Sequence, residues 1–192
     1  MKKIFLLCSI TVFVISCQRK STLTDEQVEK YTKHGKEIAQ SSFKALSSQL
    51  KQVMQAGGVK NAASYCNVAA LPLTDSLSNK YNAVIKRTSL KLRNPKNAPD
   101  SLEAKMLAMY LIMSRMRNPV MVPKILEKNA QEVQFYAPIM IKSETCLKCH
   151  GIIDDTMQRE DYGVIAELYP NDAAIGYKLG DFRGMWSITL KK

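Results

Sequence analysis

Five consecutive residues near the C-terminal end of the chain set the strongest condition on its fold. They are Cys146-Leu147-Lys148-Cys149-His150. Two cysteines with two residues between them and a histidine directly after are typical of a c-type haem attachment site. The thiols bond to one edge of the porphyrin, the spacer turns over that edge, and the imidazole reaches the iron. The run therefore predicts one covalently bound haem c, attached through Cys146 and Cys149, with His150 as axial ligand.

Three other interpretations of this run are weaker. A structural zinc site requires four ligands, and the chain has no second pair of closely spaced cysteines or histidines to complete one. A thioredoxin-type dithiol would be followed by a helix, whereas Gly151 comes next and no helical pattern is expected after it. A disulfide between Cys146 and Cys149 would close a small, strained loop. Haem is the favoured interpretation, with zinc or redox-active thiols as the alternatives.

The first residues of the chain are typical of a bacterial export signal. Lys2 and Lys3 precede an apolar segment, residues 4–15, which is too short to cross a bilayer of about 30 Å. The segment ends at Ser16-Cys17, which resembles the site where a lipoprotein signal peptide is removed and the cysteine is lipidated. We therefore predict a signal peptide over residues 1–16 and a lipid anchor on Cys17. An ordinary secretory signal with an incidental cysteine is the alternative.

This signal also predicts the organisation and location of the mature protein. Residues 17–24 are expected to be a tether, and residues 25–192 the haem domain. Lipidation ties a protein to a membrane surface without spanning it. We expect a periplasmic, membrane-anchored lipoprotein, and the sequence leaves open whether the inner or the outer membrane carries it.

Composition and charge narrow the possible partners. With 192 residues, 46% of them hydrophobic, the chain has room for about one domain with a single core. The formal net charge of +11 raises the question of nucleic-acid binding. Lysines and arginines are scattered with no block of five, however, and the predicted compartment argues against it. We predict no nucleic-acid partner and a basic surface near anionic lipid or an acidic protein.

The N-terminal part of the domain predicts helices. Thr24 and Gln27 have the spacing of a capping box, and apolar residues then recur three and four positions apart. These apolar residues are Ala39, Phe43, Leu46, Leu50 and Val53. Gly57-Gly58 predicts the end of this helix, a second helix covers about residues 59–70 and ends near the following proline, and a third covers residues 73–81.

The rest of the domain predicts three strands and a further helix. The strands are expected at residues 83–90, 132–142 and 184–190, with a proline-containing loop at residues 93–99. Asp100 and Glu103 form a capping box for a helix over about residues 102–117. Three of its methionines share a face, which is more often core filler than a set of ligands. They are Met106, Met109 and Met113.

Further motifs resemble a known bacterial family. They are Tyr65-Cys66-Asn67, the run from Arg87 to Asp100 with Glu103, Tyr169-Pro170-Asn171-Asp172, and the run from Gly176 to Gly184. With the haem-attachment run they span nearly the whole mature chain, and Arg-Thr-Ser-Leu-Lys-x-Arg-Asn-Pro-x-Asn-x-Pro-Asp is highly specific. The chain resembles the family of PAS-like domains, of unknown precise function, that carry one covalently attached c-type haem, alone or fused to sensor kinases.

The resemblance implies an α+β fold, with a PAS-like antiparallel sheet, a long N-terminal helix and flanking helices. It also implies that the cysteine matching Cys66 can ligate the haem iron opposite the histidine. From the residues alone the second axial position stays open among Cys66, water, a methionine and His34. His34 lies one step off the apolar stripe and is more typical of a solvated surface histidine. With the resemblance, Cys66 comes first, so His150 and Cys66 are the expected metal ligands.

The run from Arg87 to Asp100 suggests contact with the two haem propionates. Arginine suits bidentate carboxylate binding, so Arg87 and Arg93 are the candidates. The alternative is that Arg93-Asn94-Pro95 only organises its own loop. The glycine-rich run from Gly176 to Gly184 fits a turn beside a flat ligand, since glycine lets the backbone approach closely.

Two classes of function follow. The first is a redox or small-gas sensor, in which ligand exchange at the iron is recognised by a partner protein. The alternative is a periplasmic electron-transfer monohaem cytochrome, and the second axial ligand separates the two, because a thiolate lowers the potential and a methionine raises it. We do not expect an enzyme such as a peroxidase, because His34 is the only other histidine available for a distal acid–base pair.

Overall fold

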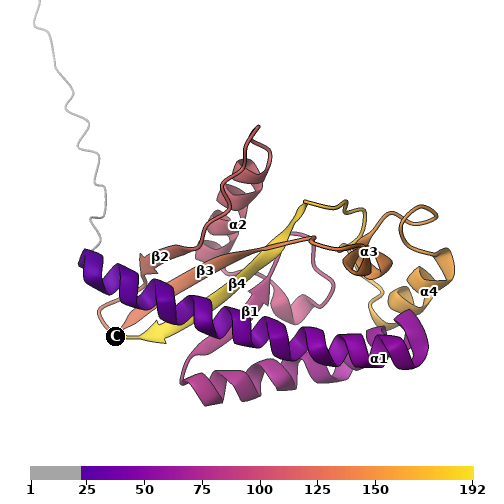
Figure 1. Ribbon diagram of the computed structural model, residues 1–192, viewed down its shortest axis with the longest axis horizontal. Coiled ribbons are helices and arrows are strands. Elements are labelled where there is room, and N and C mark those ends of the chain that lie inside the picture. Colours follow the sequence, from indigo (N-terminus) through magenta and orange to yellow (C-terminus); the bar gives the residue numbers. More distant parts are fainter. Residues whose placement is uncertain (1–22) are drawn as a thin grey trace, which may run out of the picture.

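The computed structural model describes residues 23–192, so the predicted signal peptide and Cys17 lie outside the described residues. A four-stranded antiparallel sheet, in the order β1-β4-β3-β2, forms its centre (Figure 1). The strands are β1 (Val84–Thr88), β2 (Lys124–Glu127), β3 (Glu132–Met140) and β4 (Phe182–Lys191). The long helix α1 (Asp25–Tyr81) packs on one face and α2 (Ser101–Ser114) on the other. This arrangement confirms the expected PAS-like α+β fold with a long N-terminal helix.

Helix α1 folds back on itself at a pair of glycines. It begins as predicted, because Thr24 and Gln27 cap each other through hydrogen bonds of 3.0 and 3.2 Å. Gly57 and Gly58 leave the helical conformation, and Gly58 has a φ of 65°, which glycine adopts at little cost. The two halves of α1 then lie side by side and run in opposite directions (Figure 1).

The prediction of two separate helices after the glycines is wrong. Residues 59–81 form one helix that continues through Pro72, although a proline removes one hydrogen bond from the helical ladder. Packing offsets this loss, because Ala70 and Leu77 are buried in the main core on either side of the proline. Thr74 also donates a hydrogen bond to the Ala70 carbonyl (2.8 Å). Tertiary burial therefore overrides the local break that the proline suggests.

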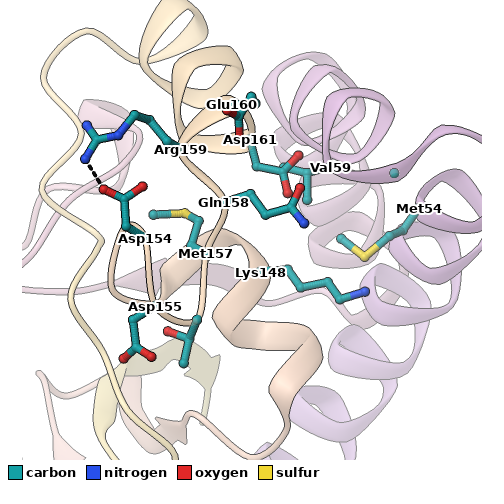
Figure 2. A pocket seen from close by; sticks show the side chains of 12 residues that line it. Met54, Val59, Lys148, Asp154, Asp155, Met157, Gln158, Arg159, Glu160 and Asp161 are labelled. Carbon is teal, nitrogen blue, oxygen red and sulfur yellow. Dashed lines mark hydrogen bonds and ion pairs between the residues drawn. The ribbon is translucent and has the colours of Figure 1, made fainter.

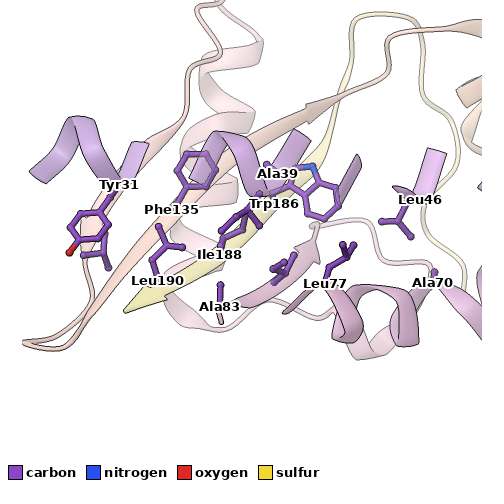
Figure 3. Close-up of a cluster of buried hydrophobic side chains, with 13 residues drawn as sticks. Tyr31, Ala39, Leu46, Ala70, Leu77, Ala83, Phe135, Trp186, Ile188 and Leu190 are labelled. Atoms are coloured by element: carbon purple, nitrogen blue, oxygen red, sulfur yellow. The ribbon is translucent and has the colours of Figure 1, made fainter. Parts of the chain in front are cut away.

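The main core lies between α1 and one face of the sheet (Figure 3). Ile38, Phe135 and Ile188 have 0% exposure, and burial of side chains of this size stabilises the fold by about 1.5–3 kcal/mol each. Helix α1 approaches the sheet closely at Gly35, where an added Cβ would lie 2.4 Å from the Phe135 ring. A residue larger than glycine would therefore push the helix away from the strand that it covers.

The alternation of β3 and the start of α2 follow the sequence prediction. Phe135 faces the main core, whereas the neighbouring Tyr136 faces a second, smaller core under α2. Asp100 accepts a hydrogen bond from the backbone of Glu103 (2.8 Å), which completes the predicted capping box. Met106 is buried in the second core, and the other two methionines of the stripe pack against it. The methionine stripe is therefore core filler.

Four short elements escaped the sequence analysis: the 3-10 helix η1 (Pro95–Asn97), β2, α3 (Glu144–His150) and α4 (Arg159–Leu168). The expectation that no helical pattern follows Gly151 is wrong, because α4 does. Strand β2 has four residues and α3 has seven, which is too short for a periodic pattern to be recognised. Within residues 23–192, none of the helices combines the length and the apolar character needed to span a membrane.

Candidate functional site

The structure brings all six predicted haem-contacting residues to one cavity of about 290 Å³. They are Cys66, Arg87, Arg93, Cys146, Cys149 and His150. They come from the second half of α1, from β1, from the loop after β1 and from α3, which are far apart in the sequence. The sheet and the folded-back helix therefore assemble a site that no single segment contains.

The predicted haem-attachment run lies on α3, and this helix orients its cysteines. Cys146 and Cys149 are three residues apart, a spacing that places side chains on the same face of a helix. Both thiols line the cavity and both are free of disulfide bonds. Burial raises the pKa of the Cys149 thiol to about 11, although Arg93 opposes the shift. The two thiols therefore face the same space.

The His150 imidazole is buried and oriented by a backbone carbonyl. Its Nδ1 lies 2.7 Å from the carbonyl oxygen of Ala174, so Nδ1 carries the proton and donates it. This tautomer leaves Nε2 with a free lone pair, as in histidines that bind metal ions. Burial holds the pKa of His150 well below its usual value, with Arg183 and Arg93 adding to the effect. The ring also packs edge-on against Tyr177, with 6.2 Å between centroids.

The Arg93 side chain links α3 to the segment with Asp172 and Ala174, whose backbone orients His150. One of its terminal nitrogens donates to the Cys149 carbonyl oxygen (2.5 Å) and to the Asp172 carboxylate (2.9 Å). The side chain of Asp172 is 1% exposed and that of Arg93 is 15% exposed, so this ion pair is largely buried. The backbone N–H of Tyr177 donates to the His150 carbonyl (3.0 Å) and holds the same two segments together. Arg93 therefore organises the site, and sequence analysis did not assign a role to Asp172.

A third arginine, Arg183, also lines the cavity. It comes from β4, and its Nη1 donates to Ser89 Oγ (2.8 Å) and to the Lys91 carbonyl (3.1 Å). Its Nε is buried, and so is that of Arg93, and neither has a hydrogen-bond partner among residues 23–192. Burial lowers the pKa of Arg183. Sequence analysis missed this residue, and its only signal was its position inside the glycine-rich motif.

Arg87 presents another guanidinium group to the same cavity. It lies over the Trp186 ring at 5.9 Å, and burial lowers its pKa while Cys66 and Tyr169 oppose the shift. The cavity thus gathers three guanidinium groups, from Arg87, Arg93 and Arg183, and Asp172 pairs with one of them. Buried like charges repel one another in a low dielectric. A ligand with two carboxylates would balance the excess.

Apolar side chains form much of the remaining wall. They include Phe43, Leu50, Ala62, Ala63, Leu71, Leu92 and Ile139. The apolar stripe predicted for α1 contacts two different regions. Phe43 and Leu50 line the cavity, whereas Ala39 and Leu46 are buried in the main core. Phe43 is 58% exposed and Leu50 is partly buried. An apolar wall with cationic groups fits a flat, hydrophobic ligand that carries carboxylates, which describes haem.

Cys66 lies on the second half of α1 and faces the cavity. Burial raises the pKa of its thiol, and the nearby Arg87 and Arg93 oppose that shift. Tyr169 also lines the cavity, and its pKa is raised by burial and by the proximity of Cys66. A soft sulfur ligand and the His150 imidazole are thus available in one cavity.

The other candidates for the second axial position lie in different places. His34 is exposed on α1, with its Nδ1 3.9 Å from the Glu37 carboxylate, as expected for a surface histidine. Met54 and Met140 line the cavity, whereas the methionines of α2 belong to the second core. Among the described residues, no three His, Cys, Asp or Glu side chains are placed to hold a bare metal ion.

A second, more open hollow of about 850 Å³ lies between α1, α3 and the segment that leads into α4 (Figure 2). Met54 lines both hollows, and Lys148 enters this one from between Cys146 and Cys149. Gly58, Val59 and residues 154–161 form the rest of its wall, where Arg159 pairs with Asp154. None of the predicted haem-contacting residues lines it.

The fold and the cavity define a PAS-like α+β domain with one apolar, arginine-rich ligand site. The family described as Tll0287-like matches residues 18–191, so the chain belongs to this family, and the resemblance drawn from its motifs is confirmed. One similar structure is described as the crystal structure of the cyanobacterial heme-protein Tll0287, with a TM-score of 0.57 and 21% identity. The match covers 88% of this chain and 98% of that one, and it supports the fold. No match was found among curated proteins.

Proposed function

We propose that this chain is an exported protein that binds one haem c covalently and acts as a redox or small-gas sensor. The observation that carries the proposal is the placement of Cys146, Cys149 and His150 on one cavity, with the imidazole Nε2 free. Membership of a family that includes a cyanobacterial heme-protein adds support. Bound haem iron would supply a reversible one-electron change and an axial position for a small ligand.

Different residues of the cavity would hold different parts of a haem. Cys146 and Cys149 would form the two thioether bonds, and His150 Nε2 would bind the iron. Arg87 and Arg183 present charge toward the carboxylates, whereas Arg93 is mostly engaged with Cys149 and Asp172 and holds α3 in place. The apolar wall would exclude water from the ring faces.

The proposed sensing role depends on Cys66. We assign it as the second iron ligand, following the resemblance and its position in the cavity. Its thiol has a raised pKa because it is buried, so it returns readily to the neutral form once no metal ion holds it as a thiolate. A haem held here would supply the binding site for a gas, and Cys66 is the residue that would hold or release the iron. A partner protein would recognise the altered site.

One alternative has an observation in its favour. Met54 and Met140 both line the cavity, so a methionine is available as the second axial ligand. A histidine and a methionine held in both oxidation states are typical of electron-transfer cytochromes. That arrangement would make the chain an electron carrier. We favour a non-enzymatic role in either case, because the described residues that line the cavity include no second histidine for acid–base catalysis.

Covalent attachment is tested by extraction of the haem into acidified acetone. The wild-type protein should retain its haem, because thioether bonds survive this treatment. Cys146→Ala and Cys149→Ala should each retain less, and the double variant should lose essentially all of it. Glu144→Gln, a change at an exposed position of α3 that removes no thiol, is the matched control and should behave like wild type. Complete extraction of haem from the wild-type protein would rule out covalent binding.

The proposed location is tested at Cys17, the predicted site of lipidation. Wild-type protein should fractionate with membranes and incorporate a labelled fatty acid, because one acyl group or more would bury its chain in the bilayer. Cys17→Ala should incorporate no label and should either be released or accumulate with its signal peptide uncleaved. Mature Cys17→Ala protein that remains with the membrane as tightly as wild type would contradict the lipid anchor.

A further inference from the structure

The last turn of α2 and the segment after it, residues 112–122, form an exposed apolar projection, the α2 tip. In Figure 1 it stands clear of the sheet and of the other helices. The exposed fractions are 68% for Ile112, 62% for Met116, 66% for Val120 and 43% for Val122. Clustered apolar side chains with this exposure mark surfaces that bind a partner or a membrane.

The charges around the α2 tip have a single sign. Arg115 and Arg117 lie within it, Lys105 and Lys124 flank it, and residues 104–126 contain no aspartate or glutamate. None of these four basic side chains takes part in an ion pair that the structure shows among residues 23–192. Their positive charge is therefore available to an anionic partner.

We propose that the α2 tip docks on the surface of a membrane that contains anionic lipid. Its apolar side chains would enter the interface while Arg115 and Arg117 contact headgroup phosphates, a combination that interfacial segments use. A second copy of the chain fits less well, because two tips of the same charge repel each other. The proposed lipid at Cys17 would only hold the protein near a membrane, whereas the α2 tip determines which face of the domain meets it.

The test uses full-length, haem-loaded protein with one added tryptophan, Val120→Trp, mixed with phosphatidylcholine vesicles with or without phosphatidylglycerol. The natural Trp186 is 5% exposed and gives a constant background. Val84→Trp is the matched control, since Val84 on β1 is 63% exposed and lies outside the α2 tip. Lipids brominated on their acyl chains quench a tryptophan that reaches them, and comparison with unbrominated lipid cancels quenching by the haem.

Val120→Trp should be quenched by brominated lipid in the anionic vesicles at least twofold more than Val84→Trp, with a blue-shifted emission. Adding Arg115→Gln or Arg117→Gln to Val120→Trp should reduce the ratio of docked to free tip by roughly fivefold for each charge removed. Equal quenching of the two tryptophans would overturn the proposal. A blue shift of Val120→Trp without vesicles would also overturn it, because another protein segment or a second copy would then cover the tip.

Discussion

Replacement of Cys66 by serine should convert the ferric haem protein from a low-spin to a high-spin form and raise its midpoint potential. A hydroxyl is a poor replacement for a soft anionic sulfur, and ferric iron would lose the partner that stabilises its extra charge. Because axial ligands tune haem potentials over a range of about 0.8 V, we expect a rise on the order of 0.1 V. Absorption and EPR spectra of the ferric state, with a redox titration, measure both effects.

Two further variants make this test specific. Cys66→Met keeps a sulfur atom without its charge, so it should remain low-spin while the potential still rises. Ser64→Ala lies on the same helix at an exposed position and should leave the spectrum and the potential unchanged. If Cys66→Ser kept the wild-type spectrum and potential, Cys66 would be only a buried core residue. Met54 or Met140 would then be the better ligand, and electron transfer the better function.

Replacement of Arg93 by alanine should lower the free energy of unfolding by about 3–5 kcal/mol, because it leaves the buried Asp172 carboxylate without its partner. The same change removes the bond to the Cys149 carbonyl, so the end of α3 should loosen. Urea denaturation followed by circular dichroism measures the stability. Hydrogen exchange at the backbone amides of residues 147–151 should report the loosening.

A second arginine–aspartate pair provides the control. Arg159 pairs with Asp154 on the surface, where their side chains are 69% and 52% exposed, so Arg159→Ala should cost less than about 1 kcal/mol. In the double variant Arg93→Ala/Asp172→Asn no charge is left unpaired, and part of the lost stability should return. Equal effects of Arg93→Ala and Arg159→Ala would show that the buried pair has no special role in holding the site.

The sequence predicted which residues share the cavity better than it predicted the helices and strands that bring them together. Cys146, Cys149 and His150 were recognisable because their chemistry depends on spacing within five residues. Helix α3, on which they lie, was not, since a helix of seven residues leaves no periodic signal. Thr24 and Asp100 marked helix starts correctly because capping is a local interaction.

Features that depend on contacts between residues far apart in the chain could not be predicted from the sequence. Arg183 bonds to Ser89 across 94 positions, and Arg93 bonds to Asp172 across 79, so neither pairing leaves a local pattern. Pro72 suggested a break that burial of Ala70 and Leu77 overrides. The motif resemblance singled out the segments that carry Arg93, Asp172 and Arg183, but it did not indicate which atoms these side chains would contact.

The position of β4 in the sheet determines when this domain is able to form. Strand β4 comes after all the other described elements in the chain, yet it stands between β1 and β3 and forms most of the pairing in the sheet. It also supplies Arg183 to the cavity. A nascent chain that ends before Phe182 therefore has two separated sheet edges and an incomplete site, and topologies dominated by such long-range pairing close slowly. Helix α3 precedes β4 in the chain, so its thiols are synthesised before the cavity is complete. Under the proposed function, haem would therefore be attached to an open chain rather than to a finished domain.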